Sequence, residues 1–97
     1  IVKAEYGLFV PNAFTPGTGD LNESFAPNGF GISNENYNFS IFNRWGELLF
    51  ESNERFEAWD GTKKGTLVIS GVYAWKVSFE DSYGKAYTNM GQVNVLR

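Results

Sequence analysis

Hydrophobic and polar residues alternate with a period of two over much of this chain, a pattern typical of half-buried β-strands. The clearest stretch is 72–80, where Tyr73, Trp75, Val77 and Phe79 occupy every second position and small, polar or charged residues lie between them. We expect these four side chains to face a core and the intervening ones to face solvent.

A hairpin is predicted upstream of this strand. The segment 37–42 alternates in the same way, 43–47 contains a glycine and has the composition of a turn, and 47–52 is apolar enough to return as the partner strand. In that returning strand the period of two puts Leu48 and Phe50 on one face.

A second hairpin closes the chain. The residues 81–84 form a tight turn that joins 72–80 to 85–90, Gly91 suggests a β-bulge, and 92–96 continues as extended chain.

Segments rich in Pro, Gly and Asn separate the strands. The apolar stretch 8–12 contains proline, which limits it to an edge strand, while 15–22 and 26–36 are expected to be loops and 52–71 a long loop. With at least five strands and no helical period, the sequence predicts an all-β fold, a small antiparallel immunoglobulin-like β-sandwich of about seven strands that forms one domain over 1–97.

Composition narrows the classes of function. Aromatic residues make up 18% of the 97 residues, so we expect a core built mostly from rings, and the formal net charge of −3 with scattered basic residues provides no basic face for nucleic acid. No apolar run approaches the roughly 20 residues of a membrane-spanning helix. The chain does not begin with Met, and we expect further sequence upstream.

The chain lacks the residues that most catalytic mechanisms require. The chain has no His and no Cys, which excludes Ser–His–Asp and Cys–His arrangements and removes the main ligands of zinc sites. A pair of catalytic carboxylates would need a cleft that so small a sandwich seldom provides. We therefore expect no enzymatic activity.

One loop has the composition of a calcium site. Asp20, Asn22 and Glu23 offer oxygen ligands close together in the chain, as calcium loops do. The alternative, which we prefer, is that Asp20 and Asn22 form hydrogen bonds to the backbone of a turn. No other cofactor is expected.

Two tryptophan-containing turns have two interpretations. Arg44 and Trp45 lie in the first hairpin turn, and Trp59 and Asp60 lie in the long loop. A sugar-binding face would use such exposed rings, with Trp75 as a third, whereas a structural role would pair Arg44 with Asp60 while the two rings close one end of the core. We prefer the structural interpretation.

Five blocks of sequence together resemble a known family. They are VPNAFTP at 10–16, IFNRWGELLFES at 41–52, WDGT at 59–62, SGVYAWKV at 70–77 and GQVNVLR at 91–97. In this order and spacing they resemble the type B carboxy-terminal sorting domain of the type IX secretion system, also called the gliding-motility-associated C-terminal domain, which is found in Bacteroidetes. The resemblance covers about residues 8–97.

The resemblance implies a domain that directs upstream cargo of the same chain through the outer-membrane type IX secretion machinery. The cargo would pass through the periplasm and be secreted or held at the cell surface. We interpret the matching motif residues as structural: Phe14, Thr15, Pro16, Asn43, Arg44, Trp45, Gly46, Trp59, Asp60, Gly61, Gly71, Val72 and Tyr73.

The terminal segment is the candidate for recognition by the translocon. Its residues are Gly91, Gln92, Val93, Asn94, Val95, Leu96 and Arg97, which end the last predicted strand.

One loop departs from the family pattern. The family usually has NGDGxND after FTP, whereas this chain has GTGDLNES. Gly19 stands where the family has its first Asp, and Glu23 replaces the second.

Two other functions compete with sorting. A carbohydrate-binding or adhesive module predicts at least two exposed aromatic side chains on one face. A structural spacer of a surface protein predicts no dependence on a translocon.

Overall fold

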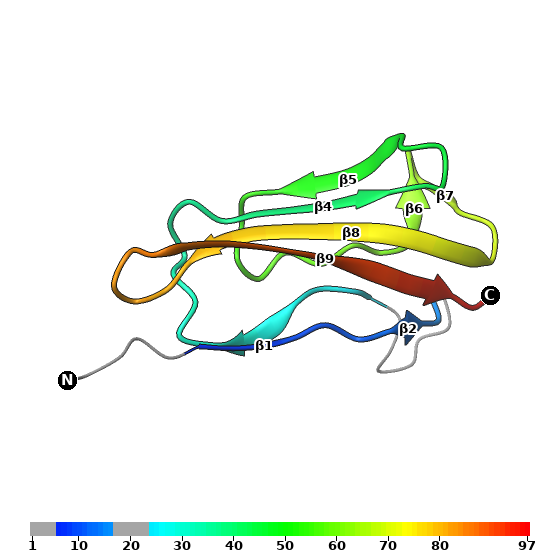
Figure 1. Ribbon diagram of the computed structural model, residues 1–97. Coiled ribbons are helices and arrows are strands. Elements are labelled where there is room, and N and C mark those ends of the chain that lie inside the picture. The colour runs from blue at the N-terminus through cyan, green and yellow to red at the C-terminus, as the bar shows by residue number, and fades with distance from the viewer. Residues whose placement is uncertain (1–5, 17–23) are drawn as a thin grey trace.

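The chain folds as a layered β-structure (Figure 1). The computed structural model describes residues 6–16 and 24–97, which form nine strands and no helix. Its main sheet has five strands in the order β2-β9-β8-β4-β5. Their bounds are β2 Ala13–Phe14, β4 Asn38–Phe42, β5 Leu48–Ser52, β8 Gly71–Glu80 and β9 Ala86–Val95.

The last two strands are the framework of this sheet. β8 and β9 pair antiparallel over all ten residues of each, from Gly71 opposite Val95 to Glu80 opposite Ala86. On its other side β9 pairs with β2, and this pair is parallel. The sheet is therefore mixed, which the sequence did not predict.

A second, smaller layer covers one face of the main sheet (Figure 1). It contains the antiparallel pair of β1 (Gly7–Phe9) and β3 (Asn28–Phe30). The prediction that 26–36 is irregular was wrong for β3. A side-chain carbon at Gly29 would collide with the Gly7 carbonyl oxygen, so the Asn and Gly residues that resemble a loop permit close pairing instead.

The long loop also contains a short hairpin. β6 (Thr62–Lys63) and β7 (Thr66–Leu67) pair antiparallel at one end of the molecule. Lys64 and Gly65 form its turn, both with positive φ.

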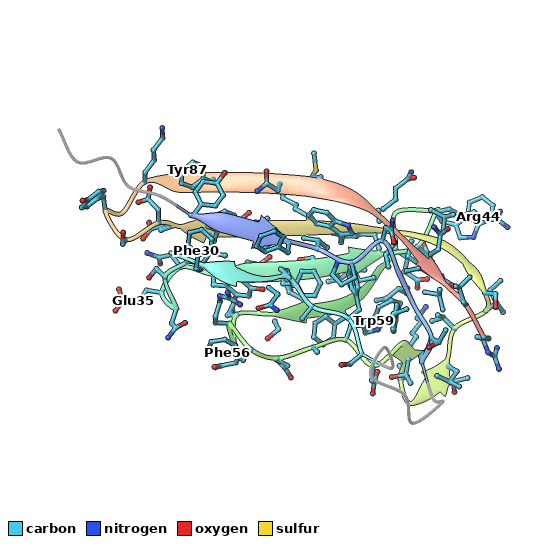
Figure 2. All side chains as sticks on the ribbon, turned by 90° about the horizontal axis from the view of Figure 1, so that it is seen from below. Phe30, Glu35, Arg44, Phe56, Trp59 and Tyr87 are labelled. Atoms are coloured by element: carbon cyan, nitrogen blue, oxygen red, sulfur yellow. The ribbon has the colours of Figure 1, made fainter. Side chains whose placement is uncertain are left out.

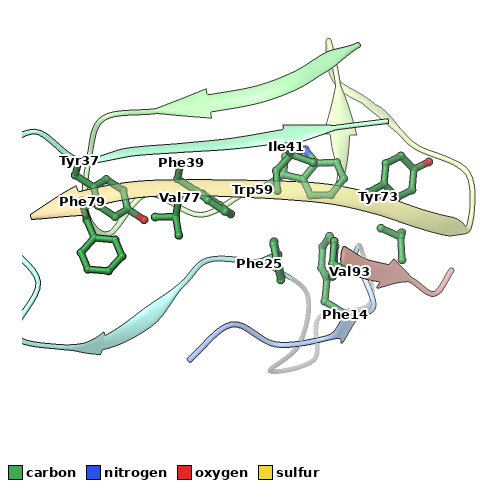
Figure 3. Close-up of a cluster of buried hydrophobic side chains, with 11 residues drawn as sticks. Phe14, Phe25, Tyr37, Phe39, Ile41, Trp59, Tyr73, Val77, Phe79 and Val93 are labelled. Atoms are coloured by element: carbon green, nitrogen blue, oxygen red, sulfur yellow. The ribbon is translucent and has the colours of Figure 1, made fainter. Parts of the chain in front are cut away.

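The core lies between the two layers and is largely aromatic (Figure 3). Trp59 is fully buried near its centre, with its ring 5.4 Å from that of Phe14 and 5.7 Å from that of Tyr73. The backbones of Trp59 and Phe25 exchange two hydrogen bonds of 2.8 Å, which hold the long loop against the second layer. The buried hydrophobic residues are Phe14, Phe25, Tyr37, Phe39, Ile41, Trp59, Tyr73, Val77, Phe79, Val93 and Val95.

The first hairpin is confirmed, but its face assignment is wrong at one position. The register of β4 and β5 shifts after the pair Ile41–Phe50, so that the next pair is Phe42–Leu48 and Leu49 is the extra residue. Because this bulge interrupts the period of two, Leu49 and Phe50 both pack against the core and Leu48 is exposed.

The expected bulge at Gly91 is absent. Gly91 lies opposite Trp75 in an uninterrupted ladder. A Cβ at Gly91 would lie 2.5 Å from the Trp75 indole, so glycine is needed there to make room for the ring.

The fold class predicted from the sequence is confirmed as a small all-β sandwich, with nine strands in its described part where about seven were expected. The alternation in 72–80 is also confirmed, because Tyr73, Val77 and Phe79 are buried and Trp75 packs against them. Within residues 6–16 and 24–97, no helix is long and apolar enough to cross a membrane.

Candidate functional site

The described residues contain no cluster of metal-binding side chains. Among residues 6–16 and 24–97 no three Asp or Glu side chains gather closely enough to hold a metal ion. Asp20, Asn22 and Glu23 lie outside the described residues, so the calcium site stays a prediction.

The FTP and WDGT motifs pack against each other. The Phe14 and Trp59 rings are in contact, and Pro16 lies over Gly61, where an added Cβ would be 2.5 Å from the proline Cβ. Asp60 fixes the turn of the WDGT motif, because its Oδ1 accepts hydrogen bonds from the Thr62 amide (3.0 Å) and from the Thr62 hydroxyl (2.6 Å). The Trp59 indole N–H in turn donates to the Thr62 carbonyl oxygen (2.9 Å).

The predicted pairing of Arg44 with Asp60 is wrong. Within the described part of the chain, the one ion pair joins Lys63 to Glu47. Arg44 instead lies over the Trp45 ring, with its Cζ 5.0 Å from the ring centroid. Trp45 does not close the core, because it is 80% exposed, and of the two rings only Trp59 is a core residue.

The NRWG turn is built by its asparagine. The Asn43 Oδ1 accepts hydrogen bonds from the amides of Trp45 and Glu47, both 2.9 Å, and Gly46 adopts φ 82°. Asn43 and Gly46 therefore shape the turn, and the turn holds Trp45 out in solvent.

A cleft of about 300 Å³ lies below this turn. Arg44, Trp45 and Lys63 line one side of it, and the start of β8 with Ile69 lines the other. Tyr73 anchors that start, because its hydroxyl donates to the Ile69 carbonyl oxygen (2.7 Å), and burial raises the pKa of Tyr73 against the opposing effect of the Arg44 and Arg97 charges. Gly71 and Val72 are exposed beside it.

The terminal segment is partly core and partly surface. Val93 and Val95 are fully buried, while Gln92, Asn94, Leu96 and Arg97 are exposed. Two backbone hydrogen bonds of 2.9 Å hold the segment to the chain around β2, from the Asn94 and Leu96 amides. The two valines build the core, so the exposed side chains and the backbone edge are the parts of this segment that are open to contact from outside.

A second hollow lies where β1 runs beneath β9, and the sequence did not predict it. Its volume is about 430 Å³ and its lining is Tyr6, Leu8, Val10, Trp75, Asn89 and Met90. The signal that would have located it is the pairing of a large aromatic residue with a glycine on the facing strand, at Trp75 and Gly91.

Comparison of solved structures shows the class of fold. The crystal structure of CopC from Methylosinus trichosporium OB3b is similar, with a TM-score of 0.60 over 90% of this chain and 84% of that one. The sequences are only 15% identical, so the likeness concerns the fold alone. No curated protein sequence matches this chain.

The family model of the CHU_C Type IX secretion signal domain matches residues 8–95. The chain belongs to this family, as the resemblance indicated. It is thus a domain of a secretion signal family, which is not a family of enzymes.

Proposed function

We propose that this domain directs an upstream cargo of the same chain through the outer-membrane type IX translocon and assists its localisation at the cell surface. The observation that carries the proposal is the family match, which spans residues 8–95. In this function the cargo crosses the periplasm, and the domain acts by binding the secretion machinery.

The arrangement of the terminal strand supports the proposal. β9 lies at one side of the main sheet, and the exposed residues Gln92, Asn94 and Leu96 alternate with buried valines. A partner can therefore contact the end of the chain while the fold stays intact.

The test is export of a fluorescent reporter that carries residues 1–97 at its carboxy end and an ordinary export signal at its amino end. It is expressed in two matched bacterial strains, with and without a working type IX translocon. We expect reporter at the surface or in the medium only in the competent strain. Equal retention in both strains would contradict the proposal and favour a spacer.

Glycan binding is the second candidate, because two exposed rings do share one face. In the β1–β3 register Gly7 pairs with Phe30, which places Phe30 on the same side as Phe9, and the two are 58% and 65% exposed. The tryptophan platform itself is not supported, since Trp59 is buried. Saturable binding to a polysaccharide panel that a double Phe9→Ser, Phe30→Ser variant loses would support glycan binding, whereas no retention on any member would count against it.

A further inference from the structure

Among the described residues, one edge of the main sheet has no partner strand over most of its length. β2 covers β9 only at Asn94 and Val95, and no described strand pairs with that side of β9 over residues 86–92. In Figure 2 the ribbon of β9 accordingly forms the outer border of the sheet along this stretch.

The direction of the free backbone groups follows from the pairing that β2 does make. The Asn94 and Leu96 amides donate toward β2, and backbone groups of alternate strand residues point to the same side. The N–H and C=O groups of Ala86, Thr88, Met90 and Gln92 therefore point outward from the sheet. They continue the ladder that β2 begins.

This edge lacks the features that usually protect sheet edges from other strands. Natural edges carry charges, prolines or bulges. β9 has no charged residue and no proline from Ala86 to Val95, and its ladder with β8 is regular. β5, at the opposite edge, is half as long, contains a bulge at Leu49 and carries Glu51.

The hollow lies directly against the open edge. Asn89 and Met90 of β9 form part of its wall, and Tyr6, Leu8 and Val10 form the wall that the second layer contributes. Gly91 has no side chain, so the Trp75 indole extends across it into this space. An added strand would thus find a recess in which one of its side chains can contact Leu8, Val10 and Trp75, beside the polar side chain of Asn89.

We propose that the edge of β9 at residues 86–92 binds an extended strand of the secretion machinery. That strand adds to the sheet through backbone hydrogen bonds and inserts an apolar side chain into the hollow lined by Leu8, Val10 and Trp75. Backbone pairing provides affinity and the recess provides selectivity, as in other cases of strand addition. The inference rests on the proposed sorting function and names the chemistry of its partner.

A second copy of this chain fits the site less well. Antiparallel pairing of two β9 edges around their centre would bring Asn89 of the partner subunit to the recess, since side chains on one face alternate. An amide in that position would gain less from contact with Leu8, Val10 and Trp75 than an aliphatic side chain would.

The open edge is tested first on the purified domain, without any translocon. In hydrogen exchange measured by NMR, we expect the Tyr87, Asn89 and Gly91 amides to be protected by β8 and the Thr88 and Met90 amides to exchange freely. Protection of Thr88 and Met90 in a monomer would show that the edge is already covered and would overturn the inference.

Binding is tested with variants of the reporter in the competent strain. Thr88→Pro removes one outward N–H and blocks an added strand, and we expect surface reporter to fall about tenfold. Thr88→Val keeps the N–H and controls for the contact of the hydroxyl with Ser78 (3.2 Å). Asn89→Glu charges the recess, because Asn89 lies opposite Val77 on the face of Trp75, and it should act like Thr88→Pro. Leu48→Glu adds the same charge on β5 and should not.

The variants are first compared by thermal unfolding, so that export is judged only for folded domains. If the unchanged reporter depends on the translocon and folded Thr88→Pro and Asn89→Glu are exported normally, the edge is not the binding site although sorting stands. If the unchanged reporter itself does not depend on the translocon, the proposed function fails and this inference with it.

The partner is identified with a photo-reactive amino acid at position 90. We expect a cross-link to a type IX component that Thr88→Pro abolishes and that the same probe at Leu48 does not form. A product of twice the mass of the chain would identify a second copy instead, and the absence of any product in an exporting strain would also overturn the inference.

Discussion

The pyrrolidine ring of Pro16 lies over the Cα of Gly61, and the two residues come from sequence motifs 45 positions apart. Gly61 has φ 82°, a left-handed conformation that residues with a side chain rarely adopt. The contact therefore depends on glycine twice, for the backbone angle and for the space.

This contact predicts how a methyl group added at Gly61 changes the stability of the fold. Gly61→Ala forces a Cβ to within 2.5 Å of Pro16, and we expect it to lower the free energy of unfolding by about 3 kcal/mol. Gly84→Ala is the matched control, since Gly84 has φ 84° with no atom within 4 Å of the added Cβ, and it should cost only about 1 kcal/mol. Equal losses in urea unfolding would show that the Pro16 contact contributes nothing.

Asp60 is expected to stabilise the fold through its turn rather than through Arg44. Asp60→Ala removes the acceptor for the Thr62 amide and hydroxyl and should cost about 1 kcal/mol of the free energy of unfolding. Asp60→Asn keeps an oxygen in the same place and should retain most of that stability. An Arg44→Ala variant should be as stable as the original chain. If it loses as much free energy of unfolding as Asp60→Ala does, an ion pair between Arg44 and Asp60 would be supported instead.

The turn between β8 and β9 predicts a dependence of stability on pH. Burial opposes ionisation of Asp81, but hydrogen bonds from the Lys85 amide (3.0 Å), the Tyr87 hydroxyl (2.9 Å) and the Tyr83 amide (2.9 Å) outweigh it and hold the pKa of Asp81 below its usual range. The hydrogen bond between the Tyr87 hydroxyl and Asp81 also raises the pKa of Tyr87.

A carboxyl group with a lowered pKa stabilises the fold above its unfolded pKa, about 3.9, and this contribution is lost as the pH falls through the folded value. We expect the melting temperature of the original chain to exceed that of Asp81→Asn at pH 7 and the difference to shrink below pH 4. A difference that stayed constant from pH 7 to pH 2 would show that the Asp81 charge has no such role.

We expect the hydroxyl of Tyr37 to lower the stability of the folded domain. Its hydroxyl is buried, no described residue forms a hydrogen bond with it, and burial raises its pKa against the effect of Arg55. Tyr37→Phe removes the unpaired group and keeps the ring, so we expect about 1 kcal/mol more stability in urea unfolding. A decrease in stability would mean that the hydroxyl has a bonding partner in solution.

The two sides of the terminal segment should respond differently to mutation. Val95→Ala opens a cavity in the core and should cost about 2 kcal/mol of the free energy of unfolding, whereas Leu96→Ala should cost less than about 0.5 kcal/mol because Leu96 is 51% exposed. Removal of 91–97 should therefore unfold the domain. Export by exposed-site variants such as Leu96→Ala is the informative measurement of recognition, and similar costs for both single variants would contradict this division.

The sequence by itself determined the class of fold, the two hairpins and the family. Alternation in 72–80 and the turns at 43–47 and 81–84 are local signals, because a period of two and a turn composition do not depend on distant contacts. The FTP, NRWG and WDGT motifs were likewise visible without coordinates.

Only the tertiary structure decided which motifs meet. Trp59 packs on Phe14 rather than beside Trp45, and Gly91 makes room for Trp75 rather than forming a bulge, because such partners are chosen by the packing of distant segments. The strand β3 was missed because its Asn and Gly residues resemble a loop until Gly7 approaches them. The open edge of β9 was also hidden, since an edge is defined by which strands fail to cover it, and no local pattern records that.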